Sequence, residues 1–303
     1  MSLVSFMGAV EIGLIFALVA LGVWISFRVL NFPDLTADGS FPLGGAVAAV
    51  LIVAGHNPWL ACAAAAAAGA VAGFVTSWLH VRLGILQLLA SILTMIALYS
   101  INLRIMDAPN VALLGEATVF TPFVSDDNAY WMQPLVLIVI VLAAKVVLDW
   151  FFTSQIGLAL RATGANARMA CAQGIATGRY TLAGMALSNA LIALAGALYV
   201  QTQGGADISM GIGTIVVGLA AVIIGETLLP SRKLFVITLA VVVGAVLYRL
   251  FITLALEADF IGLQAQDLNL ITAVLVGFAL VLPKIKAKLF GKPVAAKAKG
   301  AQS

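Results

Sequence analysis

The chain has 303 residues, of which 63% are hydrophobic and only 10% are charged, and its formal net charge is +3. Soluble domains carry about 25% charged residues, so this chain lacks the polar side chains that would cover a water-facing surface. The composition therefore excludes a soluble domain. No part of the sequence shows the period-two alternation of polarity typical of membrane β-barrels. The predicted fold is therefore an all-α, polytopic transmembrane helical bundle.

About nine membrane segments are predicted along the chain. A helical crossing takes roughly 20 apolar residues, so several of the nine are short or broken helices. Residues 41–54 resemble the rear part of a broken span that begins near Asn31. The first segment carries Glu11 and runs into Arg28 without a small-residue cleavage site, which favours a retained span over a signal peptide. The segments comprise residues 4–30, 41–54, 59–79, 84–104, 131–152, 180–200, 213–229, 234–256 and 270–283.

The placement of Lys and Arg predicts the orientation of the chain. Residues 284–303 form a basic tail that is expected to be cytoplasmic, which makes residues 1–283 a single transmembrane domain with the N-terminus outside. The same reasoning puts Arg82 and the loop 153–179 inside. Orientation and contact with anionic lipid are the expected roles of the tail, and nucleic acid is a poor explanation of its charge. The tail lysines are Lys284, Lys286, Lys288, Lys292, Lys297 and Lys299.

The longest predicted cytoplasmic loop, residues 153–179, is amphipathic and too polar to span the bilayer. Apolar residues such as Leu158 fall on one side of the predicted helix, and polar residues such as Arg161 fall on others. Gly164 and Gly174 suit turns or helix ends, which predicts a helix along the inner face with a break at Gly164. An ordinary interfacial helix is the alternative explanation of this pattern.

This loop carries the pattern G-x-x-x-R-A-x-G-x-N-x-x-x-A-x-x-x-G-I over residues 157–175, and a Gly-rich apolar helix that ends at residues 195–199 follows it. Further characteristic blocks lie at residues 30–39, 218–226 and 272–276. Together these blocks resemble the permease subunits of ATP-binding-cassette importers, and most closely the branched-chain amino acid and ribose type. They occur in order over most of the chain.

In that family the cytoplasmic segment is a coupling helix that docks into a cleft of the ATPase subunit. The resemblance also implies an extracytoplasmic solute-binding protein, a second permease copy that most simply forms a homodimer, and a place in a bacterial-type inner membrane. It assigns the contact with the ATPase to Gly157, Arg161, Gly164, Asn166, Arg168 and Gly174.

The sequence has no G-x-x-x-x-G-K-[ST] phosphate-binding loop, because its Gly-Lys pair at residues 291–292 is followed by Pro293. ATP is therefore expected to bind to a separate partner subunit, and this chain is expected to need no cofactor and to be no enzyme. His56 and His80 each stand alone, outside any H-E-x-x-H or Cys/His cluster. Neither a metal site nor a catalytic residue is predicted.

Polar residues inside the predicted spans are the candidates for the solute path, because charge in lipid is costly and usually faces a cavity or a partner. For Glu11, the alternative role is a structural hydrogen bond to a neighbouring helix. For Ser91 and Thr94, hydrogen bonds back to their own helix explain the sequence equally well. The candidate path residues are Glu11, Ser91, Thr94, Asn102 and Glu226.

Asp34 and Asp38 flank a predicted break between Pro33 and Pro42, where non-helical backbone must lie against protein or water. Helix capping near the cytoplasmic surface is the favoured explanation of both carboxylates, with Asp38 as an N-cap. Arg249, in the eighth predicted segment, is expected to be paired or to extend outward to the membrane surface.

The leading interpretation is the permease subunit of an ATP-driven importer, which moves a small solute, most simply an amino acid, by alternating access. A self-contained secondary transporter or channel is the main rival. It would show internal inverted repeats and intramembrane charges that couple to ions. No convincing repeat is visible in the sequence, and the cytoplasmic motif favours the importer. An intramembrane enzyme is a third class, for which the sequence offers no catalytic constellation.

Overall fold

The computed structural model describes residues 3–123, 129–231 and 233–257, together with the isolated positions 274 and 277. This described part is helical except for one two-stranded ribbon. Its elements in chain order are α1 (Leu3–Val23), the π-helix η1 (Trp24–Val29), α2 (Ala37–Val53), α3 (Pro58–Leu83), α4 (Gln87–Met106), β1 (Asn110–Ala112), α5 (Ala129–Thr153), α6 (Gln155–Ala165), α7 (Ala167–Ala172), α8 (Thr177–Gln203), β2 (Gly205–Asp207), α9 (Thr214–Leu228) and α10 (Leu234–Glu257).

Six helices in the described ranges are long and apolar enough to cross a membrane, and α2 and α9 are shorter apolar helices. The six correspond to six of the predicted segments, and the short pair corresponds to two more. The ninth predicted segment, residues 270–283, falls almost wholly outside the described residues. The multi-pass helical architecture is therefore confirmed, whereas the predicted count of about nine is not.

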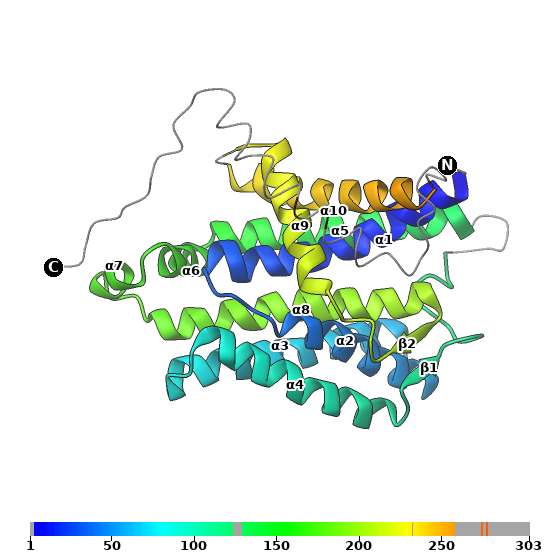
Figure 1. Cartoon of the computed structure of the whole chain (residues 1–303), viewed down its shortest axis with the longest axis horizontal. Coiled ribbons are helices and arrows are strands. Elements are labelled where there is room, and N and C mark those ends of the chain that lie inside the picture. The colour runs from blue at the N-terminus through cyan, green and yellow to red at the C-terminus, as the bar shows by residue number, and fades with distance from the viewer. Residues whose placement is uncertain (1–2, 124–128, 232, 258–273, 275–276, 278–303) are drawn as a thin grey trace.

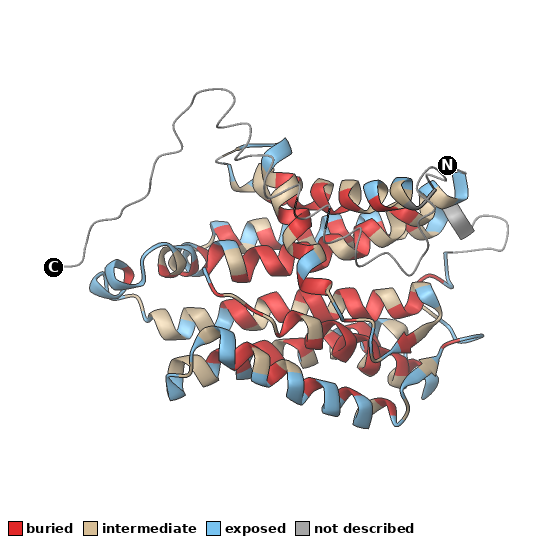
Figure 2. Ribbon diagram, viewed as in Figure 1, coloured by how far each residue is buried: buried red, intermediate tan, exposed pale blue. Residues whose placement is uncertain are grey.

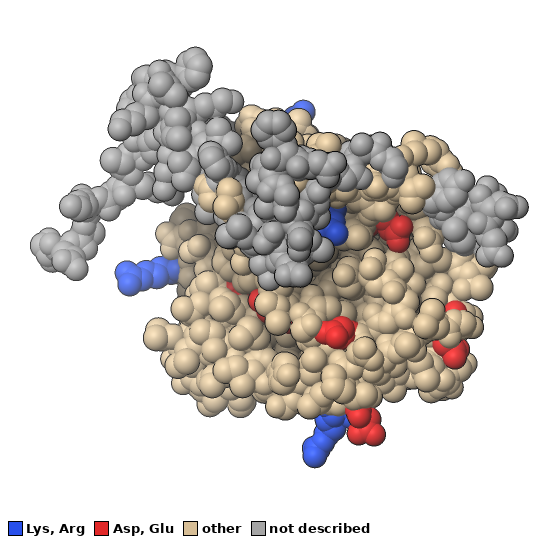
Figure 3. All heavy atoms as spheres, turned by 45° about the vertical axis from the view of Figure 1, so that its right-hand side comes forward, with Lys and Arg blue, Asp and Glu red and all other residues tan. Residues whose placement is uncertain are grey.

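The long helices lie side by side (Figure 1), with α6 and α7 at one end of the bundle and the β1–β2 ribbon at the other. We call these the α6–α7 end and the β1–β2 end. In the ribbon, Val111 pairs with Ala206 in an antiparallel register. The face shown in Figure 3 carries few charged side chains among its described residues, as a lipid-facing surface requires.

Glycines let the central helices approach until their backbones touch. Gly44 of α2 faces Ala193 of α8 so closely that a Cβ would overlap the Ala193 carbonyl oxygen. In α3, Gly69 and Gly73 face α8 in the same way, so small residues serve packing within one chain. Buried residues accordingly concentrate along α1, α2 and α8 (Figure 2), and the outward faces of α3 and α4 are exposed.

The first span ends close to its predicted boundary. α1 continues into η1, which ends at Val29, and Asn31 has a positive φ of 53°. The chain then runs without regular structure until α2 begins at Ala37. A π-helix commonly marks a functional position in a longer helix, and this one lies at the end of the first span.

Two sets of three helices share the order long, short, long. The first set is α1–η1 (27 residues), α2 (17) and α3 (26), and the second is α8 (27), α9 (15) and α10 (24). α3 packs along α8 as α10 packs along α1. Gly22 lies opposite Ser188, and Leu30 lies opposite Gly184, so α1 and α8 are antiparallel. We call these two sets the two halves of the repeat; the correspondence is in helix order and packing, and the sequence itself shows no convincing repeat.

Candidate functional site

The predicted cytoplasmic segment folds as two short helices joined at Asn166. The side chain of Ser154 caps α6 by accepting a hydrogen bond from the Gly157 amide at 3.3 Å. Asn166 is extended, with φ −157°, and its side chain caps α7 by accepting from the Met169 amide at 3.0 Å. Gly174 ends this element with a positive φ of 81°, as its sequence position predicted.

Gly164 lies within α6, so the predicted break at this residue was wrong, and the break is at Asn166. The glycine serves packing instead. A Cβ on Gly164 would overlap the carbonyl oxygen of Val29 and would lie 2.8 Å from the Leu30 Cα. Since Val29 is the last residue of η1, the backbone of α6 rests directly on the end of the first span. The two elements are therefore in direct backbone contact.

α7 projects from the bundle. Only Ala170 of its six residues is buried, and Met169 is 63% exposed. Figure 1 places α7 at the tip of the α6–α7 end, and Figure 2 shows this tip mostly in the colour of exposed residues. Arg168 and Cys171 are also exposed. A short, exposed helix with apolar and basic side chains is a surface suited to another protein.

A cleft of about 660 Å³ opens beside α6, between η1 and the ends of α9 and α10. Arg28 of η1 and Glu226 of α9 form an ion pair within it. Arg161, which the sequence assigned to coupling, lines the same cleft. The lining residues are Trp24, Arg28, Val29, Leu158, Arg161, Ala162, Gly164, Ala165, Glu226, Leu234 and Ile237.

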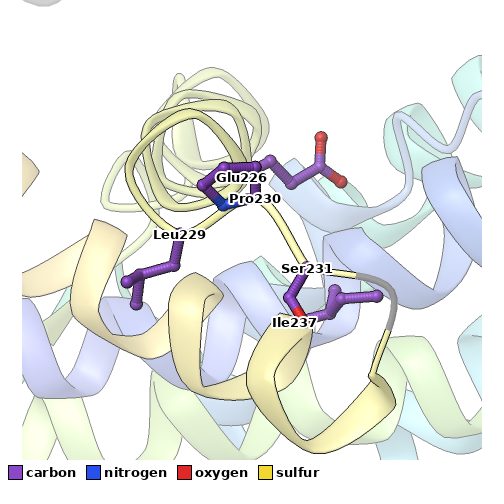
Figure 4. Close-up of a pocket in the computed structure, with 5 residues that line it drawn as sticks. All are labelled: Glu226, Leu229, Pro230, Ser231 and Ile237. Carbon is purple, nitrogen blue, oxygen red and sulfur yellow. The ribbon is translucent and has the colours of Figure 1, made fainter.

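Glu226 also borders a second pocket of about 390 Å³ at the loop between α9 and α10. Figure 4 shows its carboxylate extending away from the side chain of Leu229, on the far side of α9. The structure thus places Glu226 at the α6–α7 end, in the same cleft as Arg161, and pairs it with Arg28. It lies with residues predicted for coupling and apart from the other candidate path residues.

The polar stretch of α4 makes hydrogen bonds within the protein. The hydroxyls of Ser91 and Thr94 donate to the carbonyls of Leu88 and Ala90, which is the alternative that the sequence left open. Asn102 is fully buried, and its amide donates to the Gly39 carbonyl at 3.2 Å, joining α4 to α2. These contacts give all three residues structural roles.

Glu11 lies in α1 with intermediate exposure, and no hydrogen bond or ion pair joins it to another described residue. Arg249 of α10 likewise has no acidic partner within the described ranges, so the predicted pairing is not seen there. By contrast, Lys145 and Asp149 form an ion pair at 2.6 Å, one turn apart in α5, and Thr238 donates to Asp149 at 2.7 Å.

A buried polar network at the helix break was missed by the sequence analysis. Asp34 is only 1% exposed, and its carboxylate accepts from the Asn189 side chain at 2.8 Å and from the Thr36 amide at 3.0 Å. Ser40 donates to Asn189 at 2.7 Å, and Thr36 bonds to Thr76 at 2.8 Å. These contacts join the start of α2 to α3 and α8. Asp34 thus accepts an amide at the start of α2, as the predicted capping role requires, and its bond to Asn189 of α8 adds a contact that the sequence did not predict.

Asp38 has a different role from the predicted one. It lies in the first turn of α2, but its carboxylate accepts from the amides of Gly213 and Ile215, at 3.3 and 2.8 Å. The side chain thus caps the N-terminus of α9, where negative charge is favourable. The two short helices of the repeat begin beside each other at this carboxylate, inside the bundle.

Comparisons with known proteins agree with the family that the sequence resembles. A family model described as "Branched-chain amino acid transport system / permease component" matches residues 6–282. The chain is 38% identical to a tyrosine transport system permease protein of Clostridioides difficile (strain R20291) over 287 residues, which cover 92% of this chain and 94% of the relative. It is 34% identical to an uncharacterized protein of Rickettsia prowazekii (strain Madrid E) over 280 residues, which cover 90% and 95%. No solved structure matches the chain.

Proposed function

The chain belongs to the family of permease components of branched-chain amino acid transport systems, and we propose that it is the membrane subunit of an ATP-driven amino acid importer. Its multi-pass helical bundle and its transport relatives support a role in moving solute rather than in catalysis. A separate ATPase subunit would supply the energy, and alternating access would carry the solute across.

The observation that best supports this proposal is the direct packing of α6 against the end of the first span. The exposed α7 offers a docking surface for the ATPase, and α6 connects that surface to the end of η1 through the contact between Gly164 and Val29. When ATP closes the ATPase pair, α7 moves with it, and α6 passes the displacement to α1. In this proposal, Arg161, Asn166 and the other coupling residues act together as one lever, which transmits the movement of the ATPase to the first span.

An ion pair between two helices belongs to the same proposed movement. Arg28 on η1 and Glu226 on α9 hold the first span against the second half of the repeat at the level of α6. A shift of α6 alters the cleft that contains this pair. We infer that the pair closes the α6–α7 end in one transport state and separates in another.

The proposed assembly has two copies of this chain around a central path, two ATPase subunits below and a solute-binding protein above. The α6–α7 end would be cytoplasmic and the β1–β2 end would face outward, in an inner membrane. Residues 1–283 would form the transmembrane domain, with residues 284–303 as a cytoplasmic tail. The placement of Lys and Arg supports this orientation, and the family match supports an assembly with partner components.

Tyrosine is the first solute to test, because the Clostridioides difficile relative is named for its transport. That relative is 38% identical over nearly the whole chain. We propose an amino acid, with the aromatic ones as the leading candidates.

A native cysteine tests the coupling surface directly. Cys171 of α7 is exposed, whereas Cys62 is buried, so a membrane-impermeant maleimide should label Cys171 alone. Labelling is expected in inside-out vesicles that lack the ATPase and is expected to fall when the ATPase subunit is bound, with Cys171→Ser as the background control. Equal labelling with and without the bound ATPase would contradict the docking surface. Labelling of intact cells would reverse the proposed orientation.

A further inference from the structure

Most charged side chains inside the bundle have partners, and two do not. Lys145 and Asp149 pair with each other, and the two carboxylates at the helix break accept backbone and side-chain hydrogen bonds. Among the described residues, Glu11 of α1 and Arg249 of α10 lack any oppositely charged partner. A charge within a membrane span usually faces a partner or a functional cavity. These two therefore need another explanation.

Arg249 is held against α1. A Cβ on Gly13 would lie 3.4 Å from the Arg249 Cβ, so α10 carries the arginine directly over this turn of the first span. The Nε of Arg249 is buried and has no hydrogen-bond partner in the described part of the chain. Tyr199 and Tyr248 act electrostatically on the guanidinium. Among the described residues, the site thus supplies a cation and aromatic side chains, and no carboxylate is bonded to it.

Tyr199, which acts on this arginine, belongs to a cluster of three aromatic rings. Phe16 of α1 stacks on Phe41 of α2, with ring centroids 5.8 Å apart and planes 17° apart. Tyr199 of α8 meets both rings, at 6.4 Å from Phe16 and 5.4 Å from Phe41. Phe41 is fully buried, but Phe16, Tyr199 and Arg249 each keep intermediate exposure. Helices from both halves of the repeat contribute to the cluster.

The cluster lies toward the β1–β2 end. Tyr199 is four residues before the end of α8, or about 6 Å at the helical rise. Arg249 is eight residues before the end of α10, or about 12 Å. In the proposed orientation this is the half of the membrane that an incoming solute enters first.

We propose that Arg249, Tyr199 and Phe16 form a recognition site in the solute path, which takes an amino acid with an aromatic or large apolar side chain. The guanidinium binds the α-carboxylate through two parallel N–H···O bonds, which lysine is unable to reproduce. The rings of Phe16 and Tyr199 contact the solute side chain. This inference rests on the proposed function and adds the residues that select the solute.

The test uses the complete complex in proteoliposomes, loaded with the binding protein and L-tyrosine. Arg249→Gln and Arg249→Lys should each lower ATP-dependent uptake by about tenfold or more, since a charge-assisted hydrogen bond is lost. Assembly with the ATPase and ATP hydrolysis should remain. Arg104→Gln, at an exposed arginine of α4, is the matched control and should transport normally. Full uptake by Arg249→Gln would overturn the proposal.

A second measurement leaves Arg249 in place. In a Cys171→Ser background, Tyr199→Cys should react with a maleimide, and L-tyrosine should protect it. Tyramine, which has the same ring but no carboxylate, should protect it far less. Equal protection by both compounds, or protection by neither, would count against carboxylate recognition. If the wild-type complex takes up no amino acid at all, the proposed function itself is wrong. If the wild-type complex takes up solute and the Arg249 variants do so equally well, only the recognition site is excluded.

Discussion

Replacing Gly164 with alanine tests the link between the docking element and the first span. The added Cβ would overlap the Val29 carbonyl, and Cβ contacts below 3.0 Å are essentially never found, so α6 and η1 must separate. Overpacking of this kind costs about 1–3 kcal/mol. In a helix, alanine is favoured over glycine by about 1 kcal/mol, which opposes part of that loss.

Gly8→Ala is the matched control, because Gly8 is also helical but has open space where its Cβ would lie. It gains the same helix preference without a clash, so the two variants should differ by about 1–3 kcal/mol in stability. The assays are thermal unfolding of the purified permease and the amount of solute imported per ATP hydrolysed by the complex. Gly164→Ala should unfold earlier and import less solute per ATP. Identical behaviour of the two variants in both assays would refute the proposed lever.

Three further perturbations test other parts of the account. Arg28→Glu should lower solute import per ATP, and the charge swap Arg28→Glu with Glu226→Arg should restore much of it; thermal stability should change by no more than about 1 kcal/mol, because this pair is partly exposed. An unrestored swap would argue against the pair as a closing contact. Glu11→Gln keeps the shape of the side chain and removes its charge, so uptake should fall while assembly with the ATPase survives; normal uptake and assembly by both Glu11→Gln and Glu11→Leu would exclude a path role and a structural role alike. Asn189→Leu should destabilise the permease by about 3–5 kcal/mol, because it removes the Asn189 donor from the buried Asp34 carboxylate. Ser188→Ala removes a single hydroxyl bonded to the Gly22 carbonyl and is the milder comparison, at about 1 kcal/mol. Equal unfolding temperatures for the two variants would contradict the network.

The sequence predicted those features that depend on local chemistry. Apolar segments of membrane length predicted the six long helices, and the first span ends at Val29, one residue before its predicted boundary. Gly174 was expected at a helix end and has the positive φ that such an end requires. These predictions succeeded because each depends on residues that are adjacent in the chain.

Features that depend on distant residues were not predicted. Gly164 was predicted to break a helix. Its actual role is to leave room for the carbonyl of Val29, which lies 135 residues earlier in the chain. Asp38 resembled a local cap, yet it caps a helix that begins at Thr214. Asn189 gave no signal at all, since one amide in an apolar helix shows its role only beside Asp34. The paired halves of the bundle were missed for the same reason.

The central claim is that this chain imports an amino acid only when a separate ATPase drives it. The most direct measurement is uptake of labelled L-tyrosine and other amino acids into proteoliposomes that contain the purified permease, with or without the ATPase subunit, the binding protein and ATP. The account predicts accumulation only when all of these components are present. Accumulation by the permease alone under an ion gradient, at the rate of the complete system, would contradict the account and would favour a self-contained secondary transporter.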